Sequence, residues 1–174
     1  MSAGLEPGAG NRGMPAADLP PAVNKLLQEA VDAYSHPHRA EAILWSAQAM
    51  YPQCLPVYFA LYKFYFYQRR LQDAERAARL ALRAAAWQGG FAPEWYLATP
   101  ATTDWSDALG PQHFYLFSLK ALAFICLRRS RRTDCMAILE KLAEIDPDDS
   151  VGASVIRDLA AATADLAPCT VSAR

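Results

Sequence analysis

Apolar residues recur every three or four positions along most of the chain, which is the spacing of one face of an α-helix. Each periodic run ends at a break: a proline interrupts residues 35–38, Pro52 follows the second run, and Gly89 with Gly90 ends the fourth. The first half of the chain therefore predicts two pairs of helices with short links. They cover residues 23–34 and 39–50, and residues 56–68 and 72–87.

Small and apolar residues return at a fixed interval in the second helix of each pair. The interval between the first two pairs is about 34 residues, and the third pair follows after one more interval and an insertion of about 27 residues. A small residue lets two helices approach closely, and the residue one turn later fills the space between them. The positions read Ala40, Leu44 and Ala47 in the first pair, Ala74, Ala78 and Ala81 in the second, and Cys135, Leu139 and Leu142 in the third.

At these positions the chain resembles the tetratricopeptide repeat family, whose first helix also has a large apolar residue, a Leu, a small residue and a Tyr at set positions. The residues at those positions are Leu119, Leu122, Ala123 and Cys126 in the third unit, which fit the pattern well, and Tyr58, Leu61, Tyr62 and Tyr65 in the second, where Tyr62 replaces the small residue. The first unit has Asn24, Leu27, Gln28 and Val31 there, and its opening helix departs from the pattern. The resemblance implies antiparallel helix pairs that stack into a short right-handed solenoid, because one pair alone cannot bury its apolar stripe.

One more amphipathic stripe follows the third unit and predicts a C-terminal capping helix. Residues 147–150 carry two aspartates, which suit the N-terminus of such a helix. The expected fold class is all-α, with seven helices. The apolar positions of the stripe are Val151, Val155, Ile156, Leu159, Thr163 and Leu166.

Composition agrees with an all-α chain. Ala occurs 34 times and Leu 20 times, against 17 for Val, Ile and Thr together. With 17 Lys and Arg against 18 Asp and Glu, the net charge of -1 is too small to attract nucleic acid or anionic lipid without a local patch. No run approaches about 18 apolar residues and no signal-peptide pattern opens the chain, so we expect a cytoplasmic protein that does not contact membranes.

The ends of the chain differ from its middle. Residues 1–21 contain four of the eight Gly and four of the twelve Pro, which predicts a flexible N-terminal arm. The helical domain is expected over residues 22–166, with the insertion at about residues 88–112, and residues 167–174 form a tail.

The insertion is rich in tryptophan. A loop of this length in a small domain tends either to have structure of its own or to be functional. One helical turn is expected at residues 93–97 and another at residues 103–107. Trp95 and Trp105 either fold back between the second and third units or form an exposed binding loop.

The resemblance also implies a groove along the inner faces of the first helices. Phenylalanine and lysine alternate there, which suits a partner segment with apolar anchors and a carboxylate. The alternative is that these rings belong to the core. The predicted groove residues are Phe59, Lys63, Phe66, Tyr67, Phe117, Lys120 and Phe124.

Arginines gather in the turns between paired helices. Stacking would align these turns along one edge, which is either a solvated surface or a site for acidic or phosphate-bearing partners. The predicted edge residues are Arg69, Arg70, Arg128, Arg129, Arg131 and Arg132.

The chain carries no recognisable catalytic motif. Its cysteines, Cys54, Cys126, Cys135 and Cys169, lack Cys-x-x-Cys spacing, which argues against a zinc site. Cys126 and Cys135 fall on neighbouring helix faces, as core residues or as a redox-linked pair. No glycine-rich phosphate loop or activated nucleophile is visible, so no catalytic residue, cofactor or metal is predicted.

The sequence therefore favours a non-enzymatic protein–protein interaction module, an adaptor or assembly factor that binds a segment of a partner protein. A secretion-type chaperone for an export substrate is the alternative, and a binder of acidic partners through the arginines is a third. Nucleic acid is disfavoured as a partner. The oligomeric state and the identity of the partner stay open.

Overall fold

The chain folds into seven α-helices and one short 3₁₀ helix, in a computed structural model that describes residues 19–165. Within that range no strand is present, so the all-α prediction is confirmed. Residues 1–18 of the predicted N-terminal arm (1–21) and the predicted tail at residues 167–174 lie outside the described residues. The elements are α1 (Pro21–Asp32), α2 (Pro37–Met50), α3 (Leu55–Tyr67), α4 (Leu71–Gly89), η1 (Trp95–Leu97), α5 (Pro111–Arg128), α6 (Arg132–Ile145) and α7 (Ser154–Asp165).

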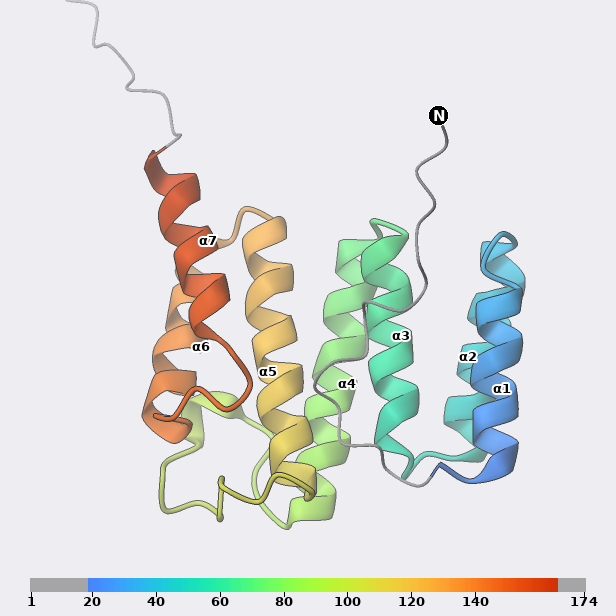
Figure 1. Ribbon diagram of the computed structural model, residues 1–174, viewed down its shortest axis with the longest axis horizontal. Helices are drawn as coiled ribbons and strands as arrows, with labels where there is room; N and C mark the ends of the chain where they lie inside the picture. Colours follow the sequence, from blue (N-terminus) through green and yellow to red (C-terminus); the bar gives the residue numbers. More distant parts are fainter. Residues whose placement is uncertain (1–18, 166–174) are drawn as a thin grey trace, which may run out of the picture.

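The helices stand side by side in a row that runs from α1 and α2 at one end to α6 and α7 at the other (Figure 1). Consecutive helices form the pairs α1 with α2, α3 with α4, and α5 with α6, and the second helix of a pair also contacts the first helix of the next. The turns inside the pairs lie along one edge of the row, and the insertion lies along the opposite edge (Figure 1). No helix of residues 19–165 combines the length and apolar character needed to cross a membrane.

Local sequence explains where several helices begin and end. Proline occupies one of the first two positions of α1, α2, α3 and α5, where its missing N–H costs no helical hydrogen bond. At the other end of α4, Gly90 takes a left-handed conformation with φ of 73°, which only glycine adopts without strain.

The small residues of α4 allow α3 to pack closely against it. Ala74, Ala78 and Ala81 are fully buried, and the large α3 side chains Tyr58 and Leu61 are also buried. The corresponding residues Cys135, Leu139 and Leu142 of α6 are buried as well. The repeated pattern of small and apolar residues thus marks the core positions of the second helices.

The turns that precede α4 and α6 share one conformation. Arg69 and Ser130 both have positive φ, 58° and 61°. The next residue donates its N–H to a carbonyl five positions back in each turn, Arg70 to Tyr65 and Arg131 to Cys126. The turn inside the third pair therefore repeats the backbone conformation of the turn inside the second.

The predicted register of α1 is wrong by one residue. The helix buries Val23 and Ala30, while Asn24 is exposed and Val31 is 62% exposed. The cause is the link between α1 and α2, residues 33–36, which is one residue longer than the links at 68–70 and 129–131. A longer link moves every α1 position by one relative to α2.

The capping helix also differs in detail from the prediction. It begins at Ser154, and the Asp149 carboxylate accepts hydrogen bonds from the N–H groups of Ala153 and Ser154. The packed side of α7 carries Ile156 and Ala160. Val155 and Leu159, which the apolar stripe predicted to be buried, are 59% and 44% exposed. The side chains of Thr163 and Leu166 are not among those that the structure describes.

Candidate partner-binding groove

All seven predicted groove residues line one cavity of about 320 Å³. The cavity, which we call the groove, lies between α3 and α5, and Ile156 of α7 closes part of it. The described residues around it are Phe59, Tyr62, Lys63, Phe66, Tyr67, Phe117, Lys120, Ala121, Phe124, Ile125 and Ile156.

The aromatic residues of α3 divide between two faces. Tyr58, Leu61 and Tyr65 are buried in the core, whereas Phe59 and Phe66 are half-buried in the groove. The ring of Phe66 lies against that of Phe124 from α5, with 5.1 Å between the ring centroids. Phe59 and Phe66 therefore fit both the core and the groove interpretation in part, because they pack on the core and also line an open cavity.

The two lysines of the groove lie over aromatic rings. The Lys63 ammonium is 5.2 Å from the centroid of Phe59 and 5.9 Å from that of Tyr67. The Lys120 ammonium is 4.6 Å from the centroid of Phe117 and also donates to the carbonyl of Val151. Burial lowers the pKa of both lysines.

Arginines of the predicted edge hold neighbouring helix pairs together. The guanidinium of Arg70, before α4, lies 2.7 Å from the carboxylate of Glu41 in α2. The guanidinium of Arg131, before α6, lies 2.9 Å from the carboxylate of Glu75 in α4. Arg70 and Arg131 also each pair with the aspartate three residues later. A glutamate–arginine ion pair thus joins the first helix pair to the second, and an equivalent one joins the second to the third.

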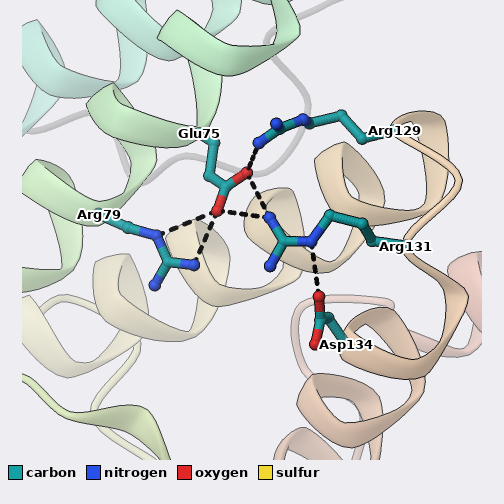
Figure 2. Close-up of polar contacts among 5 residues, drawn as sticks. All are labelled: Glu75, Arg79, Arg129, Arg131 and Asp134. Carbon is teal, nitrogen blue, oxygen red and sulfur yellow. Dashed lines mark hydrogen bonds and ion pairs between the residues drawn. The ribbon is translucent and has the colours of Figure 1, made fainter.

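Glu75 lies at the centre of the larger of these clusters (Figure 2). Its carboxylate, in a residue only 7% exposed, accepts hydrogen bonds from Arg79, Arg129 and Arg131. Burial acts to raise the pKa of Glu75, but the hydrogen bonds from Arg79 and Arg131 outweigh it and the pKa is lowered. Glu75 is thus a carboxylate held ionised inside the array.

The remaining edge arginines have other surroundings. Arg132 donates to the carbonyl of Ala160 in α7, and Arg128 lies 5.9 Å from the ring centroid of Phe66 in the groove. Arg69 is exposed in its turn. The six residues do not form one uniform surface.

Sequence reasoning missed the glutamates because it considered the arginines alone. Glu41 and Glu75 occupy equivalent positions of the first two units, and Arg70 and Arg131 occupy equivalent positions of the second and third. The charged residues thus return at the same intervals as the small residues. The recurrence of charged residues at those intervals is the sequence signal that pairs Glu41 with Arg70 and Glu75 with Arg131.

The insertion folds back onto the helices around Trp105. This side chain is 8% exposed, its indole donates to the carbonyl of Thr99, and its ring lies 5.4 Å from Phe91 and 5.8 Å from Tyr115. Trp95 is half-buried in η1, the predicted helical turn. The second predicted turn is not helical, because the Asp104 carboxylate bonds to Ser106 and holds a tighter turn.

The cysteine thiols of the described chain are free. Cys126 and Cys135 are fully buried, and burial raises the pKa of Cys126 to about 11. Cys169 lies outside the described residues. Residues 19–165 contain no group of three or more side chains placed to hold a metal ion.

A second cavity, of about 560 Å³, was not predicted. It lies where the start of α1, the α2–α3 link and the start of α5 meet, and Leu19, Met50, Cys54 and Phe114 are among its lining residues. No charged residue lines it among those described.

Comparison with known proteins gives one informative relative. No protein-family model matches the chain, and no solved structure matches it. The chain is 33% identical over 132 residues, 70% of each protein, to the uncharacterized 19.8 kDa protein in the nifW 5′ region of Azotobacter chroococcum mcd 1. It therefore belongs to the same family as that protein of Azotobacter chroococcum.

Proposed function

We propose that the protein is a non-enzymatic interaction module, an adaptor or assembly factor that holds a segment of a partner protein in the groove. The observation that carries this proposal is the convergence of half-buried aromatic rings and two lysines from α3 and α5 on one cavity. At typical protein interfaces a few side chains, often aromatic, supply most of the binding energy once the partner has covered them. We place this activity in the cytoplasm.

The same proposal includes the architecture. We propose that the helix pairs form a short right-handed solenoid of the tetratricopeptide repeat type, with α7 as its cap. The common conformation of the turns at Arg69 and Ser130 supports it, as does the return of the Glu–Arg ion pair in successive units. In such an array the first helices present a continuous surface to a partner.

The relative suggests where to look for the partner. Its name gives the position of its gene, in the 5′ region of nifW. The protein encoded by nifW is therefore a defined first bait, and proteins captured from the native host are the second.

The experiment compares groove and control variants of the full-length chain in partner capture. Phe66→Ala combined with Phe124→Ala should abolish capture, and Tyr67→Ala, at a side chain 57% exposed, should weaken it without affecting the fold. Lys25→Glu with Arg83→Glu changes two exposed charges away from the groove and should leave capture intact. Circular dichroism must show the same helical signal for all variants.

Loss of capture in the control variant alone would contradict the groove as the binding surface. If the phenylalanine variant unfolds, Tyr67→Ala decides the question, because Tyr67 is not part of the core. Normal capture by Tyr67→Ala would then count against the proposal.

An export chaperone is the second candidate. The exposed apolar side chains Met50, Trp87 and Leu109, which are 57%, 70% and 85% exposed, favour a protein that covers an aggregation-prone client. Such a chaperone should keep an aggregating client soluble at stoichiometric ratio, whereas an adaptor should not. Light scattering of the captured partner with and without this protein separates the two.

A further inference from the structure

The second cavity lies on the edge of the array that carries the insertion, and we call it the edge cavity. Its volume of about 560 Å³ falls within the range of ligand pockets. Its lining comes from the start of α1, the α2–α3 link, the end of α4 and the start of α5, so all three helix pairs contribute to it. A segment seated in the edge cavity would therefore contact every pair at once.

The edge cavity has an apolar lining and an uncovered rim. Met50 and Leu109 line it and are 57% and 85% exposed, and the buried ring of Phe114 is also part of the lining. The described residues around it include no Asp, Glu, Lys, Arg or His. A charged occupant would lose its hydration there without gaining a counter-charge, whereas an apolar occupant would cover exposed apolar side chains. The lining therefore favours an uncharged segment.

The chain itself enters the array at this cavity. Leu19 and Pro20 belong to the lining, and Leu19 also packs against the core. Residues 1–18 precede Leu19 in the sequence, so this part of the chain is attached at the wall of the edge cavity. A tethered segment has a high effective concentration at a site next to its attachment point, which gives it an advantage over any free partner.

The part of the arm next to this attachment suits the lining. Residues 13–17 read Gly-Met-Pro-Ala-Ala and carry no charge, whereas Arg12 and Asp18 stand on either side of them. Met14 is five positions before Leu19, and five extended residues span up to about 17 Å, which is enough to reach across a cavity of this volume. Methionine fills irregular apolar space, and Pro15 reduces the conformational entropy that ordering the segment costs.

We propose that residues 13–17 of the chain's own N-terminal arm occupy the edge cavity, with Met14 as the anchor. The Met14 side chain packs between Leu109 and Phe114, and the charged groups on either side of the segment stay in water. This occupant joins the helix pairs on the insertion edge, as the glutamate–arginine ion pairs join them toward the opposite edge. The edge cavity is a different surface from the groove, so the proposal does not depend on partner binding there.

Cys54 reports whether the edge cavity is filled. Its half-buried thiol is part of the lining, while Cys126 and Cys135 are fully buried. The experiment measures the rate at which N-ethylmaleimide, an uncharged reagent, alkylates Cys54 in the folded full-length protein, with mass spectrometry to assign the label. Met14→Asp should raise this rate several-fold, because a carboxylate does not enter an apolar cavity. Leu5→Asp makes the same change earlier in the arm and should leave the rate unaltered.

Thermal melting is the second measurement. Met14→Asp should lower the melting temperature by about 2–4 °C, because the helix pairs lose a shared contact. Leu109→Asp, at a rim side chain that is 85% exposed, should also lower the melting temperature and speed alkylation. The two changes remove the same contact, so the combined variant should be no more affected than the stronger single variant. Circular dichroism at low temperature should give the same helical signal for all variants.

Equal alkylation rates in the unaltered protein and in Met14→Asp would overturn the proposal. A rise of the same size in Leu5→Asp would also overturn it, because the occupant would then not be residues 13–17. Fully additive effects of Met14→Asp and Leu109→Asp would place the arm elsewhere than in the edge cavity. Protection of Cys54 that declines as the unaltered protein is diluted would assign the cavity to the arm of a second copy and contradict occupation by the chain's own arm.

Discussion

The carboxylate of Glu75 and the guanidinium of Arg131 are 2.9 Å apart across the boundary between the second and third helix pairs, although 56 residues separate them in sequence. Arg79 and Arg129 complete the surroundings of the same carboxylate. Because Glu75 is almost fully buried, it depends on these cations to offset its lost hydration.

Replacing Glu75 by alanine should therefore destabilise the protein, since it leaves three guanidinium groups close together without their carboxylate. We expect a loss of about 2–3 kcal/mol in the free energy of unfolding, measured by urea denaturation. Replacing Glu41, which is more exposed and pairs with Arg70, by alanine should lower the free energy of unfolding by about 1 kcal/mol. Glu140→Ala, at an exposed position of α6, is the control. Equal losses at Glu75 and Glu140 would contradict a role for the cluster in joining the pairs.

Acid should weaken the same cluster. The pKa values of Glu41 and Glu75 lie below 4.5 in the folded chain, so the unfolded chain binds protons more readily than the folded one. The stability that these carboxylates provide is complete above pH 4.5 and is lost as the pH falls through their lowered folded pKa values. The melting temperature of the unaltered protein should fall as the pH is lowered from about 6 to 3. The melting temperature of the Glu75→Gln variant should fall less steeply over the same range. An identical slope in Glu75→Gln would show that other carboxylates carry the effect.

The contact between α3 and α4 is sensitive to residue size at Ala74. This residue is fully buried, so Ala74→Leu should overpack the helix contact and cost about 1–3 kcal/mol of stability. Ala42→Leu, at an exposed position of α2, adds the same side chain in solvent and should have little effect. Thermal melting followed by circular dichroism compares the two. An unchanged melting temperature for Ala74→Leu would mean that the helices separate easily at this point.

Positions whose role depends on local spacing could be read from the sequence, and positions whose role depends on distant partners could not. The small residues of α4 and the groove face of α3 follow from helical periodicity, because side chains three and four residues apart share a face. The register of α1 failed because the helix pattern does not report the length of a link, and residues 33–36 contain one residue more than the other links. The ionised Glu75 was missed because two of its three partners, Arg129 and Arg131, come from the distant link between α5 and α6.

Two buried hydroxyl groups belong to Tyr62, which lines the groove, and to Ser118, and we expect them to add little to stability. The hydroxyls of Tyr62 in α3 and Ser118 in α5 have no hydrogen-bond partner of good geometry within residues 19–165. Burial raises the pKa of Tyr62, and the nearby Ser118 hydroxyl opposes this rise only in part. Removing one hydroxyl leaves the other desolvated, whereas removing both relieves both costs. We therefore expect Tyr62→Phe with Ser118→Ala to keep or raise the free energy of unfolding, by up to about 1 kcal/mol.

The single variants complete a double-mutant cycle, and the coupling between the two positions should be within about 0.5 kcal/mol of zero. A loss of stability in the double variant, together with strong coupling, would contradict this prediction, because it would mean that the two hydroxyls bond to each other in solution. In that case the hydroxyl pair would fix the distance between α3 and α5 and so the width of the groove above it. Partner capture by Tyr62→Phe would then be expected to weaken even though all seven predicted groove residues are unchanged.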